Sequence, residues 1–176
     1  MRPLNYPSGA PGSGSRVFKA NSAEKIGVIN VNGRVFMDSL ECPFKVSLAA
    51  RDELIKEAKI IIVDIHAEAT SEKIALGRYL DGKVSAVLGT HTHIQTADEK
   101  ILPMGTAYIT DVGMAGPYDS VIGRKVDDVL TRFLTSVPVK FDVAEGDVQL
   151  HAVVLDIDSA TGRANSILRI QEKLDA

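Results

Sequence analysis

Three of the four histidines in this 176-residue sequence follow short apolar runs that are typical of buried strands. His66 comes soon after residues 59–64 (KIIIVD), and His91 and His93 come soon after residues 84–88. Open α/β sheets place their ligands beyond the carboxyl ends of the strands. Imidazole is also a common ligand of divalent transition metals. The three histidines are therefore the candidate metal ligands.

The segment GTHTH, residues 89–93, separates two of these imidazoles by a single residue. In an extended backbone, side chains two positions apart point to the same side, so both rings would reach one metal or two neighbouring metals. Loop histidines that hydrogen-bond to the backbone explain the spacing about as well. The preceding glycine, which allows close backbone approach, and His66 at a second strand end favour metal ligation.

Three carboxylates lie near these strand ends: Asp64, Glu68 and Asp111. Each is a candidate partner that fixes the tautomer of a ligating imidazole. For Glu68, a solvated or helix-capping role is at least as good an explanation. The fourth histidine, His151, stands alone in an alternating strand, and we assign it a surface or structural role.

Composition excludes few functions. With a net charge of −3 and 45% hydrophobic residues, nothing demands a nucleic-acid or membrane partner. The apolar runs fall far short of the roughly 20 residues that a membrane-spanning helix needs. Residues 1–15 have no apolar core of the kind found in signal peptides, which predicts a cytoplasmic protein. The single cysteine, Cys42, excludes an intrachain disulfide.

The hydrophobic pattern predicts one α/β domain over residues 1–176, with at least one antiparallel sheet. Two strands within residues 17–31 should form a hairpin, with a turn near residues 21–25. The other predicted strands are 59–64, 84–88, 107–111, 139–143, 148–157 and 164–170, and the predicted helices are 47–59, 71–80 and 126–134.

The sequence resembles the YmdB-like family of calcineurin-type metallophosphoesterases. The likeness is carried by residues 64–73 (DIHAEATSEK), 89–98 (GTHTHIQTAD) and 102–120 (LPMGTAYITDVGMAGPYDS), and more weakly by 2–12 (RPLNYPSGAPG). Long blocks in matching order are far more specific than a His-x-His pair, and they span almost the entire chain.

The resemblance implies an αββα sandwich that holds two divalent metals, iron or manganese, and cleaves phosphodiesters such as cyclic nucleotides. It makes His66 and His91 ligands of one metal and His93 a ligand of the other. Metals in such sites clamp the phosphate and activate water for in-line attack. The substrate implied is a small phosphodiester.

The sequence departs from the family pattern in one respect. The family's amino-terminal Gly-Asp loop and its Glu-Asn and Asn-His pairs, which supply further ligands and the general acid, precede the regions seen here and are absent from the amino-terminal part of this sequence. We therefore expect a carboxy-terminal portion that lacks the amino-terminal βαβ segment and needs it to complete the site. Apolar surface left uncovered would favour self-association into a homo-oligomer.

Three hypotheses remain open at this stage. The first is an enzyme that is completed by the missing segment. The second is a catalytically incomplete module that binds metal or a protein partner. The third is a mononuclear hydrolase that uses the three histidines as they stand, in the manner of three-histidine zinc sites.

Overall fold

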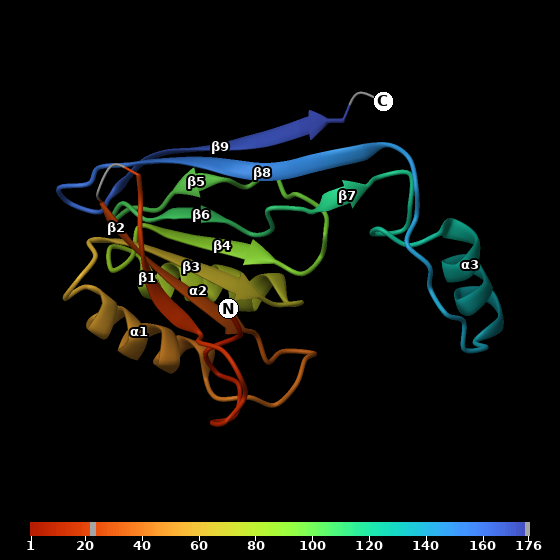
Figure 1. The fold of residues 1–176 in the computed structure, drawn as a ribbon, viewed down its shortest axis with the longest axis horizontal. Helices are drawn as coiled ribbons and strands as arrows, with labels where there is room; N and C mark the ends of the chain where they lie inside the picture. Colours follow the sequence, from red (N-terminus) through yellow and green to blue (C-terminus); the bar gives the residue numbers. More distant parts are fainter. Residues whose placement is uncertain (22–23, 175–176) are drawn as a thin grey trace.

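The computed structural model describes residues 1–21 and 24–174, which form two sheets and three helices (Figure 1). The main sheet holds six strands in the order β1-β2-β3-β4-β6-β5. Its strands are β1 (Ser15–Lys19), β2 (Lys25–Asn32), β3 (Ile60–His66), β4 (Ala86–Thr90), β5 (Lys100–Ile101) and β6 (Ala107–Ile109).

The four central strands of this sheet, β2, β3, β4 and β6, are parallel to one another, and β1 and β5 are antiparallel edges. Their carboxyl ends therefore meet at one edge of the sheet. The register there aligns Asn32 with His66 and His66 with Thr90. His91 follows Thr90 directly, so the register alone brings His91 beside His66.

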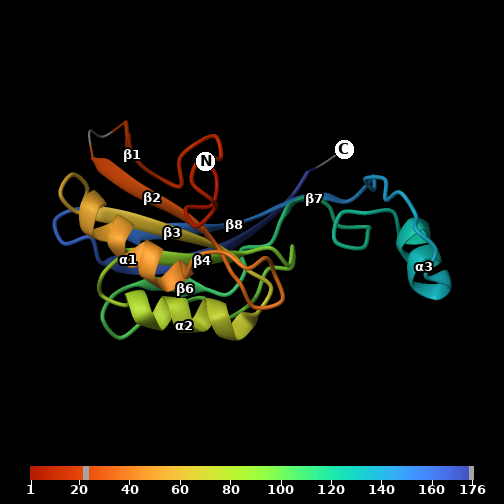
Figure 2. The same cartoon turned by 90° about the horizontal axis from the view of Figure 1, so that it is seen from below.

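Helices α1 (Pro43–Leu54) and α2 (Thr70–Leu80) cover one face of the main sheet (Figure 2). Alternate residues of β3 point into this layer, because side chains along a strand alternate between its two faces. Ile61, Val63 and Ile65 are fully buried there, together with Leu76 and Leu80 of α2.

A second, antiparallel sheet in the order β7-β8-β9 packs on the opposite face of the main sheet. Its strands are β7 (Ala115–Pro117), β8 (Val148–Ile157) and β9 (Ala164–Lys173). Ala107 and Ile109 of β6 meet Ala164 and Ile167 of β9 in a separate apolar cluster between the sheets. The layers in the body are therefore helix, sheet and sheet.

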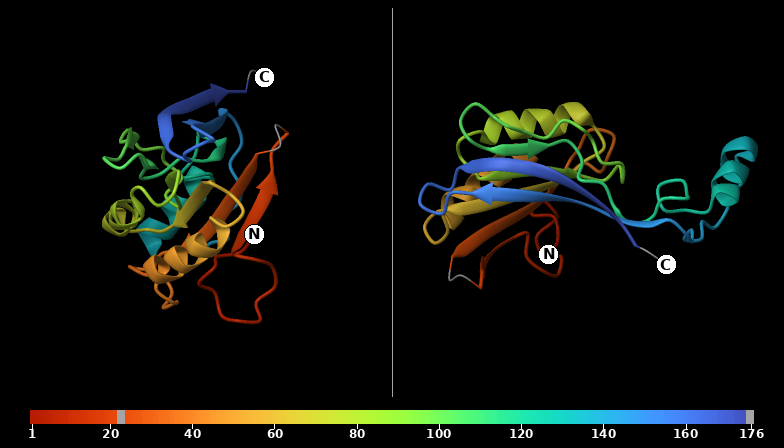
Figure 3. Two further views of the ribbon diagram at one scale, coloured as in Figure 1. Left: turned by 90° about the vertical axis from the view of Figure 1, so that its left-hand side faces the viewer. Right: turned by 90° about the horizontal axis from the view of Figure 1, so that it is seen from above.

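Helix α3 (Val126–Thr135) lies away from this body, at the end of an arm that leaves the second sheet (Figures 1 and 3). Only Val129 of this helix is buried. None of the helices that the structure describes has the length and apolar composition needed to cross a membrane.

The structure confirms most predicted elements, corrects two and adds two short strands. The helix predicted at 47–59 begins earlier, at Pro43, because proline is favoured in a first helical turn, and it ends at Leu54. The strand predicted at 139–143 is wrong: only Val143 makes an isolated bridge, to Arg124. Strands β5 and β7 are too short for an alternating pattern to reveal them. The predicted hairpin turn includes residues 22–23, which lie outside the described residues.

Gly89 sets how closely β4 approaches the end of β6. A Cβ at this position would lie 1.7 Å from the Thr110 carbonyl oxygen, whereas a Cβ at Gly116 would meet nothing within 4 Å. We expect Gly89→Ala to lower the free energy of unfolding by at least about 3 kcal/mol, because backbone cannot yield as a side chain does. Gly116→Ala should stay within about 0.5 kcal/mol of the parent chain.

Urea denaturation followed by circular dichroism measures both variants. Equal stability of Gly89→Ala and Gly116→Ala would contradict the packing of β4 against the residues after β6.

Candidate metal centre at the carboxyl edge of the main sheet

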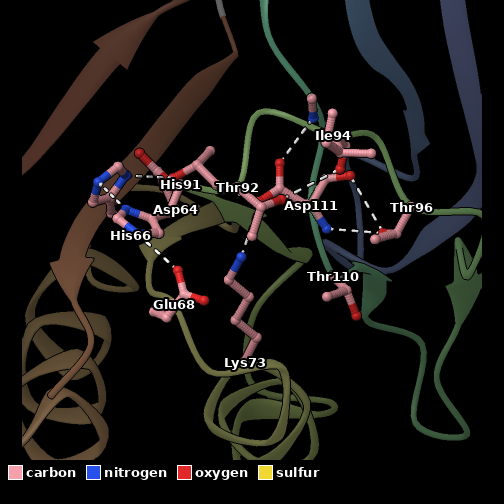
Figure 4. Close-up of polar contacts among 12 residues, drawn as sticks. Asp64, His66, Glu68, Lys73, His91, Thr92, Ile94, Thr96, Thr110 and Asp111 are labelled. Atoms are coloured by element: carbon pink, nitrogen blue, oxygen red, sulfur yellow. Dashed lines mark hydrogen bonds and ion pairs between the residues drawn. The ribbon is translucent and has the colours of Figure 1, made fainter. Parts of the chain in front are cut away.

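The imidazoles of His66 and His91 face each other at the carboxyl ends of β3 and β4 (Figure 4). Nδ1 of His91 lies 3.0 Å from Nε2 of His66. The ring centroids are 4.7 Å apart, and the ring planes are nearly perpendicular, at 86°. The two predicted ligands of one metal are therefore neighbours in the structure.

Hydrogen bonds on the outer sides of the two rings assign their tautomers. Thr90 Oγ1 donates to Asp64 Oδ1 at 3.0 Å, so it must accept the bond from Nδ1–H of His66 at 3.2 Å. Nε2 of His91 lies 3.1 Å from Glu68 Oε2, and a carboxylate only accepts, so this nitrogen also carries its proton. Both ring protons of the neutral imidazoles therefore point outward.

When both rings are neutral, the two inner nitrogens are unprotonated and face each other across 3.0 Å, whereas a His91 ring that carries a second proton donates from Nδ1 to His66 Nε2 at the same distance. The contact between neutral rings is repulsive, and either a proton or a metal ion between the nitrogens removes the repulsion. Two imidazole nitrogens that each lie about 2.1 Å from one metal have a similar separation when the angle at the metal is about 90°. The pair therefore fits a single divalent cation.

Burial supports the neutral form of His66. Burial is the main cause that lowers the pKa of His66, and a positive charge on His91, whenever that ring is protonated, lowers it further, while Asp64 opposes the shift. A lowered pKa favours the neutral ring, which is the form that binds metals. Asp64 is itself held by Asn30, whose Nδ2 donates to Asp64 Oδ2 at 2.6 Å.

His93 lies apart from this pair. Its side chain is exposed, and its Nδ1 lies 2.9 Å from the carbonyl oxygen of Ile122, to which it donates. Nε2 is thus the nitrogen left with a lone pair. Within residues 1–21 and 24–174, no group of three or more histidine, cysteine, aspartate or glutamate side chains is arranged to hold a metal.

The extended backbone expected for the His-x-His segment is wrong. His91 has φ of 111° and His93 has φ of 67°, so both residues occupy conformations that L side chains rarely adopt. His91 consequently turns toward His66 and Glu68, and His93 turns toward Ile122. Residues held in such conformations cluster at functional sites, where the surrounding structure compensates for the strain.

Asp111 has a different role from the one predicted. Its hydrogen bonds within the described part of the chain go to other groups than the imidazoles: its Oδ2 accepts from Lys73 Nζ and from the backbone N–H of Thr92, each at 2.9 Å (Figure 4). Its Oδ1 accepts a bond from Gly113 N at 2.9 Å. Asp111 therefore fixes the backbone between His91 and His93.

Lys73 is the site residue that the sequence reasoning missed. Its side chain is fully buried in an ion pair with Asp111. The signal was present in the sequence, because Lys73 precedes Leu76, Gly77 and Leu80 by three, four and seven positions, which places it on the buried stripe of α2. A lysine on such a stripe needs a buried partner.

The structural role predicted for His151 is consistent with its contacts. Its ring lies against Tyr118, with centroids 4.2 Å apart, and its Nε2 lies 3.1 Å from Gln149 Oε1. It lies in β8 of the second sheet, whereas the His66–His91 pair lies at the edge of the main sheet.

The fold and this geometry define an α/β protein with a candidate metal centre at the carboxyl edge of its main sheet. A family model described as YmdB-like protein matches residues 1–170, and the chain belongs to this family.

Known relatives agree in sequence and in structure. The chain is 54% identical over 174 residues to the 2′,3′-cyclic-nucleotide 2′-phosphodiesterase of Bacillus subtilis (strain 168), covering 97% of this chain and 64% of that protein. A crystal structure of a hypothetical protein from Thermus thermophilus matches with a TM-score of 0.90 at 46% identity, over 98% of this chain and 67% of that chain. A crystal structure of a novel phosphatase from Mycoplasma pneumoniae matches with a TM-score of 0.88 at 37% identity, over 98% of this chain and 63% of that chain. The chain thus spans roughly two thirds of the length of these relatives.

The Lys73–Asp111 ion pair gives a direct test of what holds the segment of residues 91–93, called the histidine loop below. We expect Lys73→Met to lower the free energy of unfolding by about 3–5 kcal/mol, because it leaves the buried Asp111 carboxylate without its counter-charge. Lys56 forms an exposed pair with Glu53, so Lys56→Met serves as a matched control and should change stability by less than about 0.5 kcal/mol.

Guanidinium denaturation at pH 7 compares the two lysine variants with the parent chain. A loss below about 1 kcal/mol in Lys73→Met would show that the buried pair does not hold this loop.

Proposed function

We propose that this chain forms part of a metal-dependent phosphodiesterase that acts on cyclic nucleotides or similar phosphodiesters. The observation that carries the proposal is the pair of ring nitrogens, His66 Nε2 and His91 Nδ1, that face each other at 3.0 Å. The printed activity of the Bacillus subtilis relative supports the substrate class. The name of the Mycoplasma pneumoniae structure supports phosphoester chemistry more broadly.

In this proposal, His66 and His91 bind one divalent metal, and His93 binds a second through its Nε2. Borderline cations such as iron or manganese suit imidazole ligands. Bound divalent cations would supply the charge that polarises a phosphodiester and activates water for attack on phosphorus.

The surrounding residues have positioning roles. Asp64, through Thr90, and Glu68 keep the ring protons on the outer nitrogens, so that neutral lone pairs point inward. Asp111 and Lys73 hold the backbone that joins His91 to His93. Each contact restricts the freedom of an imidazole before any metal arrives, which favours tight binding.

We further propose that residues outside these 176 supply the remaining metal ligands, the general acid and the other helix layer of an αββα sandwich. Two metals need more ligands than the three imidazoles provide.

The homo-oligomer stays a prediction. It is supported by apolar side chains on the outer face of β8 and β9, where Leu150, Val154 and Leu168 are about half exposed or more. The cytoplasmic location also stays a prediction.

Manganese-dependent hydrolysis of bis-p-nitrophenyl phosphate tests the proposal. The assay compares this chain with a version extended at its amino end to the length of its relatives. We expect hydrolysis by the extended form, and a loss of at least about 100-fold in His91→Ala, because losing a ligand should exceed the 10- to 100-fold effects of losing a ligand's hydrogen-bond partner. His151→Ala is the matched control and should retain activity.

The other results separate the alternatives. Hydrolysis by the 176-residue chain itself, lost in His91→Ala, would favour the mononuclear three-histidine site. No hydrolysis in either form, with intact folding, would favour the catalytically incomplete module and contradict the proposal.

A further inference from the structure

A small apolar pocket lies beside His93, between the histidine loop and the arm that carries α3. Its cavity volume is about 230 Å³. The pocket is lined by His93, by Val121, Ile122 and Arg124 of the following turn, by Val129 and Phe133 of α3, and by Phe141. Pockets for drug-sized ligands start at about 300 Å³, so this one suits a single flat ring system.

One hydrogen bond joins the pocket to the candidate metal ligand. His93 Nδ1 donates to the carbonyl oxygen of Ile122 at 2.9 Å, and Ile122 lines the pocket. The turn around Ile122 is closed by reciprocal bonds between Val121 and Arg124, at 2.9 and 3.0 Å. A group in the pocket therefore lies next to the ring that is proposed to bind metal.

The pocket presents aromatic and cationic groups to solvent. Phe133 is 76% exposed, although it is one of only five phenylalanines in the sequence. The Arg124 guanidinium donates to the Phe141 carbonyl oxygen at 3.3 Å, which holds a cation at the rim. Exposed aromatic rings together with arginine are the groups on which nucleic-acid bases stack.

We propose that this pocket binds the nucleobase of the substrate, and that the phosphodiester of the same molecule lies at the histidines. The inference rests on the proposed function and adds to it the part of the site that recognises a nucleotide rather than any phosphodiester. A larger apolar hollow of about 490 Å³ lies on β7, β8 and β9, but no histidine lines it. The pocket beside His93 is the one that links a base to the proposed chemistry.

Binding of adenosine, measured by saturation-transfer NMR without added metal, tests the pocket independently of catalysis. We expect adenosine to bind the parent chain and Phe133→Ala to bind it about tenfold more weakly, which corresponds to about 1.4 kcal/mol. Phe133 is exposed, so the variant should unfold at the parent temperature. Phe18→Ala, which removes a 42% exposed ring from β1, is the matched control and should bind adenosine like the parent chain.

Each remaining result has a defined meaning. Equal adenosine affinity in the parent chain and Phe133→Ala would overturn the proposal that this pocket binds a nucleobase. The absence of adenosine binding to the parent chain would overturn it as well. A change of oligomeric state in Phe133→Ala without adenosine binding would also overturn it and identify α3 as a protein contact. Phe133-dependent binding without phosphodiester hydrolysis would support the pocket and contradict the proposed function instead.

Discussion

The site depends on one constraint, which is the contact between two imidazole nitrogens 3.0 Å apart. When both rings are neutral their lone pairs repel at that distance, and a proton or a metal ion between the nitrogens removes the repulsion. The parallel register supplies the first restraint, because it aligns His66 with Thr90 and so delivers His91 to the same point. The carboxylates of Asp64 and Glu68 supply the second, because they keep both ring protons on the outer side. A metal site preorganised in this way needs little rearrangement on binding.

The backbone of the histidine loop is strained, and buried polar contacts hold it. Positive φ angles at His91 and His93 cost on the order of 1–3 kcal/mol each. Asp111 offsets part of this cost, because its carboxylate accepts a hydrogen bond from the backbone N–H of Thr92. Lys73 neutralises the buried charge of Asp111 through their ion pair. The same loop bends His93 away from His91 and toward Ile122, which places it at the edge of the apolar pocket. Metal binding and base recognition would thus share one rigid segment.

The sequence predicted the parts of this site that follow from strand pattern and residue type. Apolar runs ending at His66 and before His91 implied a common sheet edge, and the close approach expected at Gly89 is confirmed by its contact with the Thr110 carbonyl. The conformation of the loop was not predictable, since an alternating period describes extended backbone and these histidines are not extended. The partner of Asp111 was missed because a lysine in an amphipathic helix is usually assigned to the solvated face, although Lys73 lies on the buried stripe. The sequence pattern predicted helix α3 but gave no indication that it lies on an arm away from the two sheets.

The most direct test of the metal centre is anomalous X-ray diffraction from crystals of this chain soaked in Mn²⁺. We expect an anomalous peak between His66 Nε2 and His91 Nδ1, at about 2.0–2.3 Å from each nitrogen. Absence of a peak at this pair, with manganese bound elsewhere or not at all, would contradict the claim that the facing nitrogens form a metal site.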